Sequence, residues 1–149
     1  MSDELLAGAL AAIGRRERTV AEMERWLEQR EAGPDERARV IAYLTENLAL
    51  DDARFAEAFT ADKRQLSGWG NDRIEQALRR RGIRSDLIGS ALEQPGDGTE
   101  VDRAARLLAE KRVELGDDRG RSRALGMLAR RGYSAEDAYA AIRRAGPDH

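Results

Sequence analysis

The fold is decided by the stretch from Leu50 to Leu92, LDDARFAEAFTADKRQLSGWGNDRIEQALRRRGIRSDLIGSAL. It holds the clearest helix start and stop signals in the chain. Its second half also recurs: the Leu, Arg and Gly at positions 78, 81 and 82 return at 128, 131 and 132. In a chain of 149 residues, this repeat predicts small modules that stack on their neighbours instead of sharing one central core.

Local signals divide this stretch into three predicted helices. The first begins after Asp51 or Asp52, whose carboxylates can accept hydrogen bonds from free amides at a helix start. Gly68 and Gly70 end this helix because glycine favours a break. Its predicted inward residues are Phe55, Phe59 and Leu66.

The second predicted helix begins with Asn71 as its cap and ends at Gly82, which can adopt the left-handed conformation that residues with a Cβ resist. Ile83 then folds back on Leu78, and the same stop returns as Leu128, Gly132 and Tyr133. Ser85 caps a short third helix. The predicted inward residues of these two helices are Ile74, Ala77, Leu78, Ile88, Ala91 and Leu92.

Three helices are predicted before Leu50. One follows Ser2, and a second opens with Thr19 and Glu22 in the spacing of a capping box and stops at Gly33. Pro34 begins the third, because proline is favoured in the first turn of a helix. The apolar spacings predict these inward residues: Leu6, Leu10, Ile13, Val20, Met23, Leu27, Val40, Ile41, Leu44 and Leu48.

After Leu92, Pro95 and two glycines allow neither helix nor strand to continue, so residues 94–98 are the predicted linker. Thr99 and Asp102 begin a new helix, Gly116 and the polar run 117–121 interrupt it, and Ser134 with Asp137 caps the last one. Inward residues are Val101, Ala104, Ala105, Leu108, Ala124, Leu125 and Leu128. No alternating strand pattern occurs. The sequence predicts an all-α fold of about nine helices in three-helix repeats at 1–49, 50–93 and 99–149.

Composition excludes several classes of protein. The 26 basic and 28 acidic residues leave a formal charge of -2, so this is no uniformly basic nucleic-acid coat. Residues 99–149 hold 11 basic and 9 acidic groups, so any basic face lies toward the C-terminus. Without cysteine there is no disulfide, and His149 is the only histidine. No apolar run reaches the ~20 residues of a membrane span and no signal peptide is evident, so the cytoplasm is expected.

Several motifs, taken together in order, are specific enough to indicate a family. They are LDDARFA at 50–56, Gly68 and Gly70 followed by Arg73 and Ile74, LRRRGI at 78–83, and RRGYS at 130–134. In this ordered set the chain resembles RecX, bacterial regulatory proteins of the RecA recombinase, over nearly its whole length. The resemblance implies that the three-helix repeats form an elongated and curved array.

The resemblance also implies a function. It implies a non-enzymatic protein without cofactor or metal that binds as a monomer in the groove of the RecA–DNA filament. There it limits filament growth, ATP hydrolysis and strand exchange, and so acts in homologous recombination, DNA repair and the SOS response. Some relatives are basic, so the charge of -2 argues against strong contact with single- or double-stranded DNA.

Ten residues form the predicted binding site for RecA or DNA: Lys63, Arg64, Trp69, Arg73, Arg79, Arg80, Arg81, Arg84, Arg130 and Arg131. A doubled set of arginines suits acidic surface or phosphates. The alternative is structural, because a helix dipole favours each cation in the last turn by about 0.3 to 1 kcal/mol. Trp69 and Tyr133 either pack between repeats or anchor a partner. Residues predicted as caps, turns and core are Asp51, Asp52, Phe55, Gly68, Gly70, Gly82, Ile83 and Gly132.

The sequence offers little support for catalysis, metal binding or recognition of DNA bases. Nucleophilic catalysis lacks its cysteine or internal histidine, and the pairs Asp51–Asp52 and Asp117–Asp118 lie where helix caps belong, not metal ligands. A helix-turn-helix over residues 73–92 would present Asp86 and apolar groups to DNA bases. Two alternatives stay open: a DNA-binding helical protein acting independently of RecA, and a helical-repeat adaptor for another partner.

Overall fold

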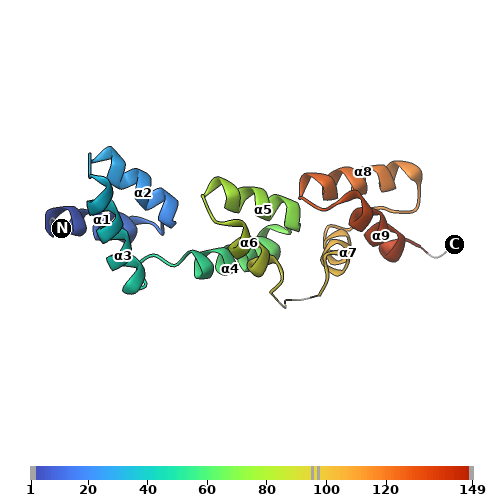
Figure 1. The fold of residues 1–149 in the computed structure, drawn as a ribbon. Coiled ribbons are helices and arrows are strands. Elements are labelled where there is room, and N and C mark those ends of the chain that lie inside the picture. The colour runs from blue at the N-terminus through green and yellow to red at the C-terminus, as the bar shows by residue number, and fades with distance from the viewer. Residues whose placement is uncertain (1–2, 95, 97, 148–149) are drawn as a thin grey trace. The chain divides into compact units, whose positions relative to one another are not determined.

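The computed structural model describes residues 3–94, 96 and 98–147. Within these residues the chain forms nine α-helices and no strand, so the all-α prediction is confirmed (Figure 1). A π-helical turn, Lys63–Ser67, continues α4. The predictions made for Ser2, Pro95, Asp97 and His149, and thus part of the linker, lie outside the described residues. The helices are α1 (Asp3–Arg15), α2 (Val20–Gln29), α3 (Pro34–Glu46), α4 (Asp52–Asp62), α5 (Asn71–Arg80), α6 (Ser85–Leu92), α7 (Glu100–Glu110), α8 (Asp118–Arg130) and α9 (Ala135–Ala145).

The chain divides into two compact units. The first unit comprises residues 1–56 and 78–89, and the second comprises residues 57–77 and 90–149. The assignment of three repeats to 1–49, 50–93 and 99–149 stays a prediction.

The core of the first unit packs α2 against α1 and α3. Two predicted inward residues are wrong: Leu10 is 44% exposed and Leu48 is 63% exposed. Helix α1 turns small residues inward because the Trp26 ring lies against it, so that a Cβ at Gly8 would be 3.1 Å from the ring. Leu48 lies beyond the end of α3 with φ 60°, where helical spacing no longer directs it. The buried residues are Ala9, Ala12, Met23, Trp26, Leu27, Ala32, Val40, Leu44 and Leu50.

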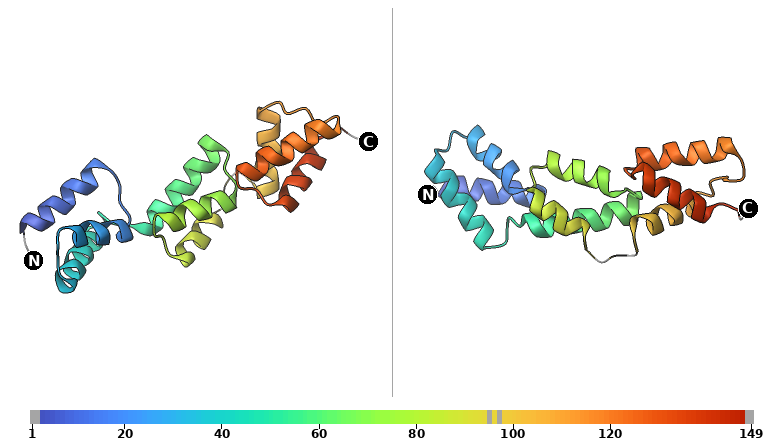
Figure 2. Two further views of the ribbon diagram at one scale, coloured as in Figure 1. Left: turned by 90° about the horizontal axis from the view of Figure 1, so that it is seen from above. Right: turned by 45° about the vertical axis from the view of Figure 1, so that its right-hand side comes forward.

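The core of the second unit lies where α9 packs against α7 and α8, and both views in Figure 2 show α8 and α9 side by side. Helix α7 ends at Glu110, before Gly116, and residues 118–121 are helical. The predicted interruption is confirmed at Gly116 and Asp117 but is wrong for residues 118–121: the Gly120 N–H donates to Asp117 over 2.7 Å, which caps α8. The buried residues are Ala104, Leu107, Leu108, Leu115, Ala124, Leu128, Tyr133, Ala138, Ala141 and Ile142.

The inward direction predicted for Leu66 is also wrong, because its side chain is 79% exposed. In a continuous α-helix Leu66 would share a face with the buried Phe55. The π-helical turn bonds over five residues instead of four, which rotates the side chains that follow. Leu66 consequently faces solvent.

The predicted helix stops at Gly82 and Gly132 are confirmed. Their φ angles are 83° and 95°, and the N–H groups of Ile83 and Tyr133 donate back to Leu78 and Leu128 over 3.1 and 3.0 Å. The prediction for Gly33 is wrong, because α2 ends at Gln29 and Gly33 precedes α3. Glu31 takes the left-handed position there, with φ 61°, so the stop geometry is retained without glycine.

Most predicted helix starts are confirmed, including the capping boxes of Thr19 and Thr99 and the caps of Asp51 and Ser134. Asn71 and Ser85 are not caps but the first residues of their helices. The Ser85 hydroxyl accepts a hydrogen bond from Arg79. Asp52 serves another helix: the Val20 N–H at the start of α2 donates to it over 3.0 Å.

Candidate partner-binding surface

The predicted binding residues fall into both units. Arg79, Arg80, Arg81 and Arg84 belong to the first unit, and the others belong to the second. The chemical surroundings of the side chains differ between the two groups. The members of the second group are Lys63, Arg64, Trp69, Arg73, Arg130 and Arg131.

Arg81 is turned into the first unit, onto Glu22. Its Nε and Nη2 donate to the two carboxylate oxygens over 2.6 and 2.9 Å, and its guanidinium lies 4.6 Å from the Phe55 ring centroid. Thr19 Oγ1 donates to the Arg81 carbonyl over 2.6 Å. Burial alone would raise the pKa of Glu22, but hydrogen bonds from Arg81 and the Thr19 backbone outweigh burial and lower it. Arg81 therefore joins α5 to α2 within this unit.

The other three predicted binding residues of the first unit, Arg79, Arg80 and Arg84, are exposed. Arg79 donates to the Ser85 hydroxyl over 3.4 Å, and Arg84 pairs with Asp86 over 3.2 Å. Exposed ion pairs of this kind contribute little to stability, at most about 1 kcal/mol. Arg84 can therefore exchange its ion pair with Asp86 for a contact with a partner at small cost.

In the second unit, the start of α5 is bonded to the end of α8 through the backbone. The Gly70 N–H donates to the Arg131 carbonyl over 2.7 Å, and the Asp72 N–H donates to the Gly132 carbonyl over 3.1 Å. A Cβ at Gly132 would lie 2.5 Å from the Arg73 nitrogen, which no side chain tolerates. Glycine at this position allows the two backbones to meet.

Cations surround Trp69 at this joint. The Lys63 ammonium lies 4.6 Å and the Arg73 guanidinium 4.1 Å from a Trp69 ring centroid, within the range of cation–π attraction. Arg73 also donates to the Arg130 carbonyl over 3.1 Å, and Arg131 donates to the Ser67 carbonyl over 2.6 Å. We call Lys63, Trp69, Arg73, Arg130 and Arg131 the cationic cluster.

The cationic cluster has no carboxylate partner among the residues that the structure describes. The carbonyl groups that accept from Arg73 and Arg131 are neutral, so they leave the positive charge in place. Trp69 is half-buried and meets Phe59 edge to face, at a centroid distance of 6.3 Å. The cluster thus combines an aromatic surface with several uncompensated charges.

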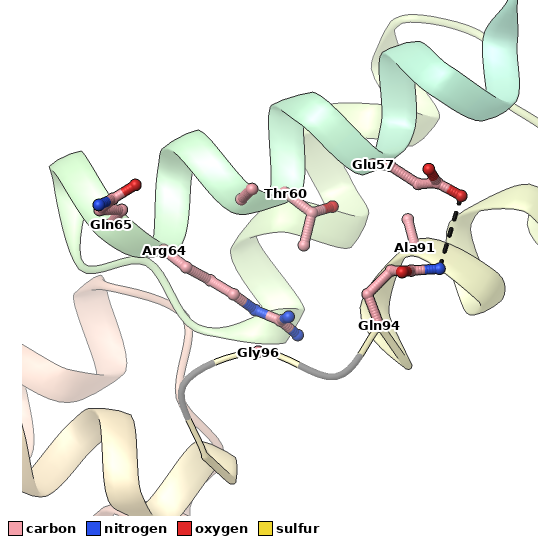
Figure 3. Close-up of a pocket in the computed structure, with 8 residues that line it drawn as sticks. Glu57, Thr60, Arg64, Gln65, Ala91, Gln94 and Gly96 are labelled. Carbon is pink, nitrogen blue, oxygen red and sulfur yellow. Dashed lines mark hydrogen bonds between the residues drawn. The ribbon is translucent and has the colours of Figure 1, made fainter.

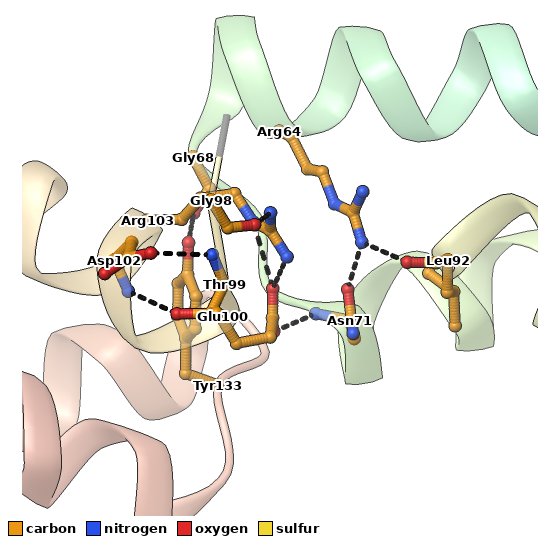
Figure 4. Close-up of polar contacts among 10 residues, drawn as sticks. All are labelled: Arg64, Gly68, Asn71, Leu92, Gly98, Thr99, Glu100, Asp102, Arg103 and Tyr133. Atoms are coloured by element: carbon orange, nitrogen blue, oxygen red, sulfur yellow. Dashed lines mark hydrogen bonds and ion pairs between the residues drawn. The ribbon is translucent and has the colours of Figure 1, made fainter. Parts of the chain in front are cut away.

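Arg64, the remaining predicted binding residue, is held inside the second unit (Figure 4). Its Nη2 donates to the Asn71 side chain over 2.7 Å and to the Leu92 carbonyl over 2.8 Å. The Asn71 N–H donates to Glu100 over 2.7 Å, so the side chain that accepts at the start of α5 is Glu100 and not the predicted Asn71. Tyr133 is buried and donates to the Gly68 carbonyl, and burial raises the pKa of Tyr133 to about 12. These groups hold the unit together.

A hollow of about 280 Å³ lies beside Arg64 (Figure 3). Thr60 and Arg64 line it from the α4 side, while Ala91 and Gln94 line it from the other side. Gln94 donates to Glu57 over 3.5 Å. In the described part of the chain, no three His, Cys, Asp or Glu side chains gather to hold a metal ion.

The paired aspartates have structural contacts. The Arg54 N–H donates to Asp51, and the Val20 N–H donates to Asp52. Asp117 caps α8 and Asp118 pairs with Arg121. Their lone pairs are directed at amides and a guanidinium.

Sequence reasoning missed Glu22 as the partner of Arg81 and Glu100 as the acceptor at the start of α5. The sequence predicts Glu22 only in its own capping box and predicts no role for Glu100. Both act on residues far along the chain, and helix periodicity carries no information about such pairs. The one available hint was the acidic residue itself, placed in the first turn of a helix.

A family model described as RecX, second three-helix domain, matches residues 51–92. The chain is 37% identical over 141 residues to regulatory protein RecX of Trichlorobacter lovleyi, covering 91% of this chain and 90% of that protein. It is 35% identical over 152 residues to regulatory protein RecX of Halorhodospira halophila, covering 99% and 91%.

The fold also matches a solved structure. The crystal structure of RecX from Lactobacillus salivarius superposes with a TM-score of 0.83 at 21% identity, covering 95% of this chain and 94% of that one. The fold is therefore that of an all-α protein with the architecture of this solved RecX chain. The extensive identity to the curated relatives goes further: this chain belongs to the RecX family of regulatory proteins. None of its described helices has the length and apolar character needed to span a bilayer.

Proposed function

We propose that this protein is a non-enzymatic modulator, mainly an inhibitor, of the RecA recombinase. It binds as a monomer in the groove of the RecA–DNA filament in the cytoplasm, and it limits filament growth, ATP hydrolysis and strand exchange. The elongated and curved array that the family resemblance implies would suit this site, because a slim chain can bridge successive subunits.

The cationic cluster is the observation that carries this proposal. Its arginines and lysine are not neutralised by carboxylates of the described residues, and two of these cations, Lys63 and Arg73, border a half-buried tryptophan. Interfaces commonly place tryptophan and arginine at their energetic centre. An acidic surface of the recombinase would supply the missing negative charge. Arg79, Arg80 and Arg84 extend the proposal to the first unit, while Arg64 and Arg81 act within the chain.

The test is sedimentation with preformed RecA filaments, together with RecA's DNA-dependent ATPase. Wild-type protein should co-sediment and suppress the ATPase. The double variant Lys63→Glu/Arg130→Glu should bind about tenfold more weakly, because it reverses two charges at the surface. The matched control is Arg119→Glu/Arg123→Glu, which makes the same charge change at exposed positions of α8.

Three outcomes separate the possibilities. Loss of binding in the cluster variant alone supports the proposal. Equal loss in both variants would indicate a general charge effect and remove the cluster from the site. Normal ATPase activity and strand exchange at saturating wild-type protein would overturn the function.

The second candidate is direct DNA binding independent of RecA, favoured by Trp69 between two cations. Bases stack on such aromatic groups, at about 1 to 3 kcal/mol per base. Steep, salt-sensitive binding to naked DNA without binding to filaments would favour it. The formal charge of -2 argues against it.

A further inference from the structure

A second surface of different character lies in the first unit. It is an open hollow of about 580 Å³, formed by the start of α2, the segment between α3 and α4, and the turn between α5 and α6. Its apolar lining is Val20, Ala21, Leu48, Leu50, Ala53 and Leu87. We call it the Leu48 hollow.

Leu48 has no evident role in folding. Its side chain is 63% exposed, although it is a large apolar group. It also holds the left-handed conformation that ends α3, with φ 60°. At the corresponding stops of α2, α5, α7 and α8 the chain has Glu31, Gly82, Arg112 and Gly132. Glycine would fit there with less strain and a charged residue with better solvation, so neither the helix stop nor burial explains leucine.

The charges of the Leu48 hollow are mostly negative. Three carboxylates line it, from Glu24, Asp51 and Asp52, against the single guanidinium of Arg84. Glu24 pairs with Arg37, and Arg84 pairs with Asp86. Asp51 and Asp52 accept from backbone amides, which are neutral, and no cation of the described residues forms an ion pair with either. The lining of the hollow therefore combines apolar side chains with an excess of carboxylates over cations.

We propose that the Leu48 hollow docks a protein segment of the recombinase that carries an apolar side chain flanked by lysine or arginine. The apolar side chain packs against Leu48 and its apolar neighbours in the hollow, and the flanking cations approach Asp51 and Asp52. The identity of the partner rests on the proposed function. This segment is opposite in charge to the acidic surface that the cationic cluster is proposed to bind.

Leu48→Gly separates a docking role from a structural one. Glycine relieves the left-handed strain, so the urea midpoint of the variant should equal or exceed that of wild type. Binding to RecA filaments should nevertheless weaken about tenfold, because the apolar anchor is lost. The control is Leu10→Ala, which removes another exposed leucine of the same unit, 44% accessible in α1, and should leave binding unchanged.

The charge requirement is tested at Ala53, an exposed residue of the hollow near the start of α4. Ala53→Arg should weaken binding about tenfold by repelling the cationic segment, whereas Ala53→Glu, of similar size, should bind at least as well as wild type. A synthetic peptide with leucine flanked by arginines should shift the amide NMR signals of Leu48 and Asp51, and one with glutamates in place of the arginines should not.

Several results would overturn this inference. One is filament binding by Leu48→Gly at wild-type strength, and another is equal effects of the two Ala53 variants; in either case the proposed function still stands. Self-association of the chain that disappears in Leu48→Gly would assign the hollow to a second copy instead. If wild-type protein failed to sediment with filaments and the arginine peptide also produced no shifts, both the function and the inference would be wrong.

Discussion

The ends of α5 and α8 carry the same Leu-x-x-Arg-Gly stop, yet their arginines have different partners. Arg81, after α5, forms a two-oxygen ion pair with Glu22 of α2. Arg131, after α8, donates to the neutral Ser67 carbonyl. Each stop meets the start of another helix: Thr19 donates to the Arg81 carbonyl, and Gly70 donates to the Arg131 carbonyl. The two joints are alike in their backbone contacts, but they differ in the charge of the group that accepts from the arginine.

One position accounts for much of this difference. Glu22 is the third residue of α2, and the third residue of α5 is Arg73. Where the first unit has a carboxylate to receive the arginine, the second unit has another guanidinium, which stacks on Trp69. The comparison teaches that a repeated backbone joint can be kept while its side chains change from a closed ion pair to an open cationic surface.

The largest expected effect concerns the glycines at the two joints. Gly132→Ala should destabilise by about 3 kcal/mol, because its Cβ would meet the backbone of Arg73 at a left-handed position. Gly82→Ala should cost about 2 kcal/mol, because its Cβ would meet mainly the Ala21 Cβ, at 2.4 Å. Urea unfolding measures both.

A second substitution sharpens this contrast. Ala21→Gly removes the one side-chain atom that opposes Gly82→Ala, so the double variant should recover about 1 kcal/mol. No substitution of Arg73 can remove its backbone nitrogen, so Gly132→Ala should resist rescue. If a substitution at Arg73 restored the stability of Gly132→Ala as fully as Ala21→Gly restores that of Gly82→Ala, the backbone contact described for Gly132 would be contradicted.

The next effect concerns the arginines. Arg81→Met should destabilise by about 2 kcal/mol, because it leaves the mostly buried Glu22 carboxylate without its partner. Arg131→Met loses one hydrogen bond to a carbonyl and should cost about 1 kcal/mol. Thermal and urea unfolding of the matched pair provide the measurement. The reverse order would show that the ion pair contributes less than its geometry indicates.

Binding to RecA filaments should distinguish the exposed arginines of the two units. Arg79→Glu/Arg80→Glu should weaken binding only about threefold, less than the change expected for Lys63→Glu/Arg130→Glu. The reason is that the cationic cluster has an aromatic anchor beside its charges. Sedimentation at two salt concentrations measures the filament binding of both double variants, and circular dichroism is the control for folding. A larger loss from Arg79 and Arg80 would move the proposed surface to the first unit.

The smallest expected effect is a pH dependence confined to the first joint. Folding lowers the pKa of Glu22 below its ordinary 4.5, so its ion pair stabilises the protein above that pH and loses this contribution as pH falls through the folded value. The stability difference between wild type and Glu22→Gln should therefore be greatest near neutrality and shrink in acid. The difference between wild type and Arg131→Met should change little, because a carbonyl does not titrate.

The sequence alone determined the local architecture. Periodicity, capping boxes and glycine stops predicted nine helices and the stops at Gly82 and Gly132, because these signals act within a few residues. It failed where a competing local geometry intervened, as when the π-helical turn rotated Leu66 outward and Glu31 took the position of a glycine. The motifs from Leu50 to Ile83 and at 130–134 were also enough to indicate the family.

Only the tertiary structure decided what the arginines do. Arg81 and Arg131 are equivalent in the repeat, and nothing local distinguishes a guanidinium paired with Glu22 from one bonded to a carbonyl. The same holds for Leu48, which spacing placed in the core and the structure places, exposed, in a hollow lined by three carboxylates. The physical reason is that charge compensation and exposure depend on atoms brought together from distant parts of the chain, whereas helix starts and stops depend on neighbours along it.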